Sequence, residues 1–194
     1  MPETKKKNRR AYLNSFRKNK EGKYDYTGNV YYFEGNDIEG NGVEGNGFGE
    51  NGETLRSRLI KLWLPGAVLM GCLIAAGCIS APGMDNCFYV LLPYAASLMA
   101  GISMLWALGR MTAGGNPLKE YVYQASVEKL PERAAMTVFF TAAAAAGETI
   151  YICLHGTEGK LAGFCIFMLL NFVSAGAAFM LRREIQTMKW IKHG

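Results

Sequence analysis

Four long apolar runs dominate the later part of the chain, and they constrain its fold more than any other feature. They cover residues 59–80, 86–109, 134–154 and 161–181. A run of about 18 or more residues with few charges is long enough to cross a membrane as a helix. Each run rises roughly 30 Å as a helix, which matches the hydrocarbon core of a bilayer. The sequence therefore predicts an all-α membrane protein, a bundle of four transmembrane helices within residues 55–194.

The placement of lysine and arginine predicts how these helices are oriented. The chain has a formal net charge of +5. Its basic residues gather before the first run, between the second and third runs, and after the fourth, whereas the two other loops hold only Lys160. Cytoplasmic segments carry this kind of excess. We expect a multi-pass protein of the cell membrane, built as two helical hairpins with both termini cytoplasmic. We expect no signal peptide, because the basic region lies far from the first run.

The segment before the first run divides into three parts. Residues 1–23 form a basic tail, which could attract anionic lipid headgroups or serve only to fix the topology. Residues 24–33 read "YDYTGNVYYF", and aromatic residues on both sides of a turn predict a small β-hairpin. A partly disordered aromatic linker is the alternative. An isolated hairpin is marginal in water, so its aromatic face would need a membrane surface, a partner or a second copy.

Residues 34–54 repeat a five-residue phrase, "EGNDIEGNGVEGNGFGENG" being its clearest part. A period of five fits neither a helix nor a strand. A calcium loop starting at Asp37 fails at its twelfth position, because Phe48 cannot supply the carboxylate pair that such loops need. We interpret the stretch as a flexible, acidic, glycine-rich linker.

Two further segments are expected to lie at the cytoplasmic membrane surface. Residues 117–130 predict an amphipathic interfacial helix with Pro117 at its first position, serving as a connector or as a contact for a soluble partner. The tail after the fourth run is expected to continue as a helix. Its basic and aromatic residues predict anchors for anionic headgroups: Arg182, Arg183, Lys189, Trp190 and Lys192.

One ionisable residue, Glu148, lies deep in a predicted span. It falls roughly 10 Å below the outer surface, and a charge at such depth is costly. Tyr94 and Asn171 reach a similar depth, and Tyr151 is a helical neighbour of Glu148. These four residues predict an intramembrane polar site. It could be a protonatable site of a proton-coupled carrier, or a carboxyl held by hydrogen bonds that fasten the helices together.

The sequence contains five cysteines, four of which are predicted to lie in the outer part of the bundle. Disulfides across the outer turns are conceivable, and buried thiols acting as small apolar side chains are the ordinary alternative. The chain lacks a C-x-x-C pair, and its two histidines are far apart in sequence, so neither thiol catalysis nor a metal site is predicted. The four outer thiols are Cys78, Cys87, Cys153 and Cys165.

No motif for hydrolysis or for phosphate binding is present, so we expect no enzyme and no cofactor. The leading hypothesis is a non-enzymatic accessory or scaffolding subunit of a cytoplasmic-membrane assembly, with a protein partner on the cytoplasmic side. The second is a small proton-coupled carrier that uses Glu148 and acts as a homodimer. The third, membrane thiol chemistry, requires outer cysteines that change redox state. Binding to nucleic acid is not expected.

Overall fold

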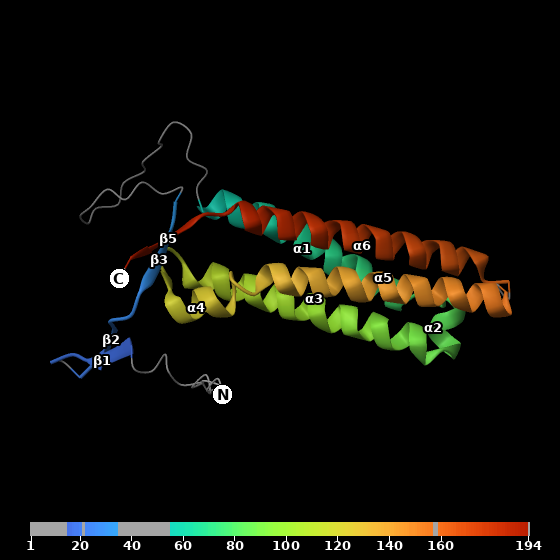
Figure 1. Ribbon diagram of the computed structural model, residues 1–194, viewed down its shortest axis with the longest axis horizontal. Helices are drawn as coiled ribbons and strands as arrows, with labels where there is room; N and C mark the ends of the chain where they lie inside the picture. The colour runs from blue at the N-terminus through green and yellow to red at the C-terminus, as the bar shows by residue number, and fades with distance from the viewer. Residues whose placement is uncertain (1–14, 21, 35–54, 157–158, 194) are drawn as a thin grey trace, which may run out of the picture.

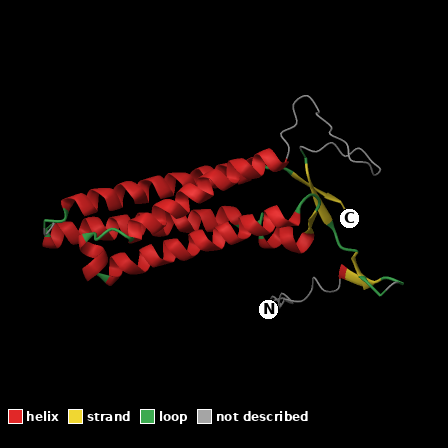
Figure 2. Cartoon of the chain, turned by 180° about the vertical axis from the view of Figure 1, so that it is seen from behind, coloured by secondary structure: helices red, strands yellow, loops and turns green. Residues whose placement is uncertain are grey.

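The computed structural model describes residues 15–20, 22–34, 55–156 and 159–193. Four long helices lie side by side as a bundle, and the strands gather at one of its ends, which we call the sheet end (Figures 1 and 2). The helices are α1 Leu55–Gly77, α2 Pro82–Asn86, α3 Phe88–Gly114, α4 Glu120–Ala125, α5 Leu130–His155 and α6 Leu161–Thr187. The strands are β1 Phe16–Lys18, β2 Tyr24–Tyr26, β3 Val30–Phe33, β4 Leu118–Lys119 and β5 Trp190–His193.

Four helices are long and apolar enough to cross a membrane, which confirms the predicted helical bundle. Within it, α3 packs along α5, and α6 packs along both α1 and α5. Large apolar side chains point outward: Trp106 on α3 is 71% exposed and Phe172 on α6 is 70% exposed. Such a surface is suited to lipid rather than to water. By length and composition, the chain is a multi-pass membrane protein.

The helices extend beyond the apolar runs that predicted them. α3 continues from the predicted end at residue 109 to Gly114, α5 starts at Leu130, and α6 continues to Thr187. A hydrocarbon boundary does not end a helix, because its hydrogen bonds continue until the backbone turns away. Gly115 provides such a turn after α3, since its φ of 67° is readily adopted by glycine.

The predicted hairpin within residues 24–33 is wrong in its pairing, although both halves do form strands. β2 pairs antiparallel with β1, so the hairpin is made with the preceding basic segment. β3 lies in the middle of a separate three-stranded sheet, between β4 and β5. The turn between β2 and β3 thus separates two sheets. The local turn signal was present, but β2 pairs with the segment just before it, and β3 pairs with segments far along the chain.

The interfacial helix predicted over residues 117–130 is shorter than expected, because its first residues form β4. α4 starts only at Glu120, and a turn separates it from α5. The tail after α6 also differs from its prediction, since it leaves the helix after Thr187 and forms β5. In both places, pairing with β3 replaces a helical continuation.

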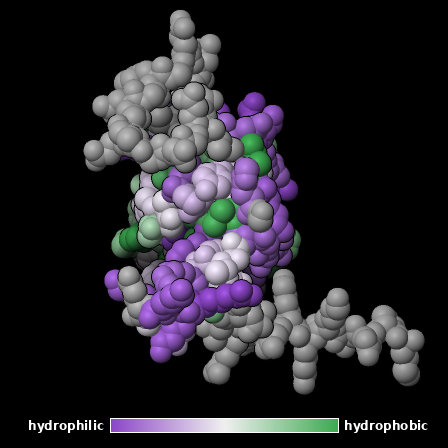
Figure 3. Space-filling view, turned by 90° about the vertical axis from the view of Figure 1, so that its left-hand side faces the viewer, coloured by the Kyte–Doolittle hydropathy of each residue, from purple (hydrophilic) through white to green (hydrophobic). Residues whose placement is uncertain are grey.

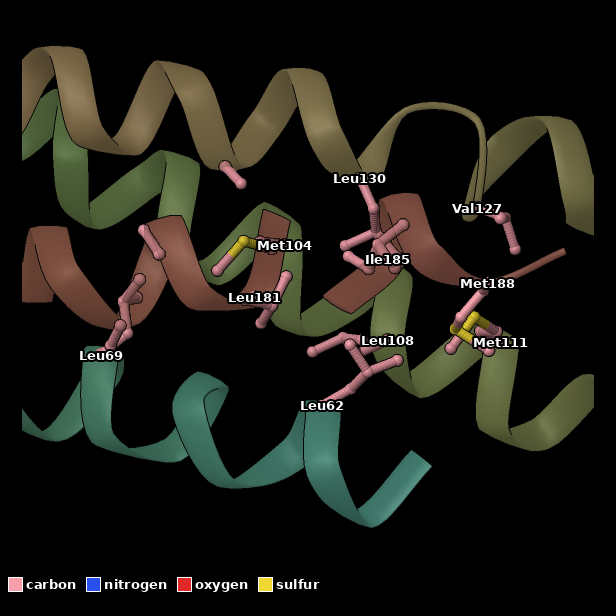
Figure 4. Close-up of a cluster of buried hydrophobic side chains, with 14 of the residues drawn as sticks. Leu62, Leu69, Met104, Leu108, Met111, Val127, Leu130, Leu181, Ile185 and Met188 are labelled. Carbon is pink, nitrogen blue, oxygen red and sulfur yellow. The ribbon is translucent and has the colours of Figure 1, made fainter. Parts of the chain in front are cut away.

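The three-stranded sheet is attached to the bundle through its aromatic residues. Phe33 is buried, and the centre of its ring lies 5.7 Å from the centre of the Trp190 ring. The rings of Tyr31 and Tyr123 are stacked, with 4.0 Å between their centres. Alternate residues of a strand face the same side, so Tyr31 and Phe33 form one face. This face continues into the main apolar core, drawn in Figure 4, which includes Met111 and Met188. The aromatic side chains of β3 therefore pack against the sheet end of their own bundle.

A close approach between α6 and the turn after α1 constrains Gly163. A Cβ atom at this position would lie 2.7 Å from the backbone oxygen of Ser80. At Gly176, on the same helix, a Cβ atom would meet nothing within 4 Å. We therefore expect Gly163→Ala to lower the free energy of unfolding by about 1–3 kcal/mol, because a backbone oxygen cannot move aside as a side chain can.

The matched control is Gly176→Ala, which adds the same methyl group to the same helix. It should leave stability unchanged or raise it slightly, since alanine favours a helix more than glycine does. Thermal unfolding in one detergent would compare the two variants. Equal shifts for both would contradict the close packing of α6 on the turn after α1.

Candidate functional site

The buried carboxylate of Glu148 lies near the end of the bundle opposite the sheet, which we call the α2 end. α2 is a single turn in the segment "APGMDN", where the sequence predicted only a loop. Glu148 on α5 is fully buried, and its Oε1 accepts a hydrogen bond from the N–H of Gly83 at 3.1 Å. The carboxylate thus binds the backbone of α2 to α5.

Gly83 permits this contact because it has no side chain. A Cβ atom there would collide with Glu148 Oε2 and would lie 3.0 Å from Cγ2 of Val90. Among the described residues, Oε2 has no hydrogen-bond partner. One carboxylate oxygen therefore serves a structural bond, and the other is available for a proton. Sequence reasoning missed Gly83, since Pro82-Gly83 signalled a turn but not the partner of that turn.

Tyr94 and Asn171, two further members of the predicted site, make their hydrogen bonds to backbone oxygens. The hydroxyl of Tyr94 on α3 donates to the carbonyl oxygen of Leu73 on α1 at 2.5 Å. Nδ2 of Asn171 donates to the carbonyl oxygen of Phe167 on its own helix at 2.9 Å, whereas its Oδ1 has no partner among the described residues. Tyr94 therefore joins two helices, and Asn171 leaves one polar atom unpaired inside the bundle.

Tyr151, the fourth member, is buried on α5, and its ring stacks on that of His155 with 4.7 Å between the ring centres. An apolar cluster that contains Tyr94, Ala144 and Phe167 packs at the same end of the bundle. All four predicted residues are thus buried. Whether they act together as a site stays a prediction.

An exposed ion pair lies beside α2. Nζ of Lys160 is 3.0 Å from Oδ2 of Asp85, and the hydroxyl of Ser80 donates to the same oxygen at 2.7 Å. The hydrogen bond from Ser80, with the ammonium of Lys160, holds the pKa of Asp85 below its ordinary value. Both charged side chains are well exposed, so their contribution to stability is small. The pair connects α2 to the start of α6.

The five cysteines are free thiols in this structure. Cys78, Cys153 and Cys165 are exposed, while Cys87 is partly covered. No three His, Cys, Asp or Glu side chains gather as a metal site in the part of the chain that is described. The geometry supports uptake or release of a proton at one buried carboxyl, that of Glu148.

The predicted headgroup anchors all lie at the sheet end, in two different settings. Arg182 and Arg183 are exposed on the last turns of α6, and Lys192 is exposed on β5. Lys189 is 3.8 Å from Glu34, and Trp190 packs against Phe33 and Tyr123. The indole of Trp190 is thus engaged by the protein itself, whereas the arginines face outward.

The fold and the buried carboxylate define the class of the molecule, a multi-pass helical membrane protein with a small cap of strands at one end. Comparisons with protein-family models, curated proteins and solved structures each find no match.

Proposed function

We propose that this chain is a non-enzymatic accessory or scaffolding subunit of a cytoplasmic-membrane assembly, and that its sheet end lies in the cytoplasm and binds a protein partner. The observation that carries the proposal is the joining of three distant segments at one end of the bundle. β3 comes from the N-terminal part, β4 from the middle loop and β5 from the part after α6. Strands that are already paired can present a binding surface that separate tails cannot, because less conformational entropy is lost when a partner binds.

The charge of the sheet end supports a cytoplasmic location and an acidic partner. Among the described residues seen from this end, hydrophilic surface predominates (Figure 3). Basic residues exposed there favour the cytoplasmic side and attract acidic surfaces. They are Arg17, Lys18, Lys20, Lys23, Lys119, Lys189 and Lys192.

The β1–β2 hairpin is held in place beside this cap. Phe16, Tyr26 and Tyr121 form a cluster of rings, and the ammonium of Lys119 lies 5.9 Å and 5.6 Å from the centres of the first two. Asn29 Nδ2 also donates to Glu120 Oε2 at 3.0 Å. These contacts fix the hairpin to α4. Tyr24, the first residue of β2, takes no part in them and is 70% exposed.

The proposal predicts a specific crosslinking pattern in intact cells. A photoreactive phenylalanine analogue at Tyr24 should crosslink to a second, different protein. The same analogue at Phe88 should not, although Phe88 is 73% exposed, because it lies at the α2 end. Mild detergent should also extract a complex much heavier than the 21.3 kDa chain or its dimer. A bare monomer or homodimer, with no crosslink at Tyr24, would contradict the subunit role.

A proton-coupled carrier that acts as a homodimer is the second candidate, and Oε2 of Glu148 is the observation that favours it. This buried oxygen lacks a hydrogen-bond partner among the described residues, so its protonation would not first require a bond to be broken. The bond from Gly83 to the other oxygen favours the structural role instead. The variants of Glu148 described in the Discussion separate these roles.

A further inference from the structure

We infer that a hollow between α1 and α6 at the sheet end binds the phosphate of an anionic phospholipid. The hollow has a volume of about 410 Å³. Its lining residues are Arg58 on α1, with Met180, Arg183, Glu184 and Thr187 on α6. The inference rests on the proposed cytoplasmic location of the sheet end but not on the subunit role, because a carrier and a scaffold would both have a lipid boundary here.

The charged side of the hollow suits a phosphate group. The lining residues include two arginines, from two helices, and one glutamate, so their formal charges sum to a positive value. Guanidinium groups bind phosphate oxygens through paired hydrogen bonds. Basic pockets between transmembrane helices on the cytoplasmic side of a membrane are suited to anionic headgroups.

Two described contacts within the hollow involve Arg58 and Thr187. Nη1 of Arg58 reaches Oε2 of Glu184 at 3.4 Å, which is long for a charge-assisted hydrogen bond. The hydroxyl of Thr187 donates to the carbonyl oxygen of Glu184 at 2.7 Å, which leaves its oxygen able to accept but not to donate elsewhere. Among the lining residues, the two arginines are the cationic donors, and their guanidinium groups are suited to phosphate oxygens.

The other side of the hollow suits an acyl chain. Met180 is 62% exposed, and its neighbour Phe179 is 61% exposed, on the turn of α6 next to the arginines. Basic residues and exposed apolar residues thus lie on adjacent turns of α6. This arrangement suits a lipid with an anionic headgroup and a hydrocarbon chain. A free phosphate ion would use the arginines but gain nothing from Met180.

The test uses the full chain in mild detergent and compares three added probes. These are phosphatidylglycerol, phosphatidylcholine and inorganic phosphate, each followed by thermal unfolding and by the number of lipids retained in native mass spectrometry. We expect phosphatidylglycerol to stabilise the protein more than phosphatidylcholine does. A similar shift with inorganic phosphate alone would overturn the assignment to a lipid.

Arg183→Gln is the test variant, and Arg182→Gln is its matched control. Both remove one exposed arginine from the same turn of α6, but only Arg183 lines the hollow. We expect Arg183→Gln to weaken the apparent affinity for phosphatidylglycerol roughly tenfold, and Arg182→Gln to change it little. Equal loss in both variants would show a general attraction to basic charge and would overturn the site. Unfolding without added lipid verifies that both variants are folded.

Discussion

Phe33→Ala should release the three-stranded sheet from the bundle while the four long helices remain folded. Phe33 is 5% exposed and belongs to the main apolar core, where its ring meets Trp190. Removing a buried phenylalanine ring costs about 3–5 kcal/mol, through lost contacts and the cavity that remains. Because β3 lies in the middle of the sheet, the loss would affect β4 and β5 as well.

Hydrogen exchange of the protein in detergent, followed by mass spectrometry, measures this effect directly. Amide exchange in β3 and β5 should rise on the order of a hundredfold or more, since local opening sets the exchange rate. Peptides from α3 and α5 should change little. Tyr24→Ala is the control, because it removes an aromatic ring that is 70% exposed on β2. Unchanged exchange in β5 after Phe33→Ala would show that the sheet does not depend on this ring.

Glu148→Ala should destabilise the α2 end, and Glu148→Gln should do so far less. Alanine leaves a cavity and removes the acceptor of the Gly83 N–H, whereas glutamine keeps an oxygen at nearly the same position. A buried donor without a partner costs about 1–3 kcal/mol, and a cavity adds to this. We therefore expect Glu148→Ala to be less stable than Glu148→Gln by about 2–4 kcal/mol in thermal or chemical unfolding.

The same pair of variants distinguishes the two candidate functions. A structural carboxyl predicts that Glu148→Gln keeps normal complex formation and stability. A proton-coupled carrier predicts that Glu148→Gln abolishes uptake into proteoliposomes driven by a proton gradient, although the protein remains folded. Uptake of every tested solute at the native rate would remove the carrier role. Equal stability of the alanine and glutamine variants would contradict the bond between Glu148 and Gly83.

The long helices were predictable from the sequence because one quantity, the length of each continuous apolar run, determines them. Twenty or so consecutive apolar residues have few alternatives to a spanning helix. Their ends were less predictable: the tail after the fourth run was expected to stay helical, but α6 ends at Thr187 and β5 follows it. The linker predicted over residues 34–54 and the first 14 residues of the basic tail lie outside the described residues, Glu34 excepted.

The sheet was not predictable from local signals, because its strands are far apart in the chain. Val30 is aligned with both Lys119 and His193. The turn residues after Tyr26 favoured pairing with the nearest aromatic strand, and a segment as short as Leu118–Lys119 carries no strand signal of its own. Contacts of such large sequence separation depend on how the helices bring the loops together.

In each candidate site, some residues were identifiable from the sequence, whereas their partners were not. Glu148 was identifiable because a lone charge in an apolar run is conspicuous. Its partner Gly83 was not, since 65 residues separate them and glycine offers only its backbone. The hollow beside Arg183 was also hidden, because Arg58 joins it only when α1 and α6 lie side by side.

The pairing of β3 with β5 imposes an order on the biogenesis of the protein. β3 is synthesised before the first span, whereas β5 follows the last one. The edge of β3 must therefore remain open while all four spans are inserted, and it closes only when α6 is in place. An open strand edge readily pairs with other chains. A partner that recognises the closed sheet would bind only molecules whose insertion is complete, so that assembly would itself select correctly inserted copies.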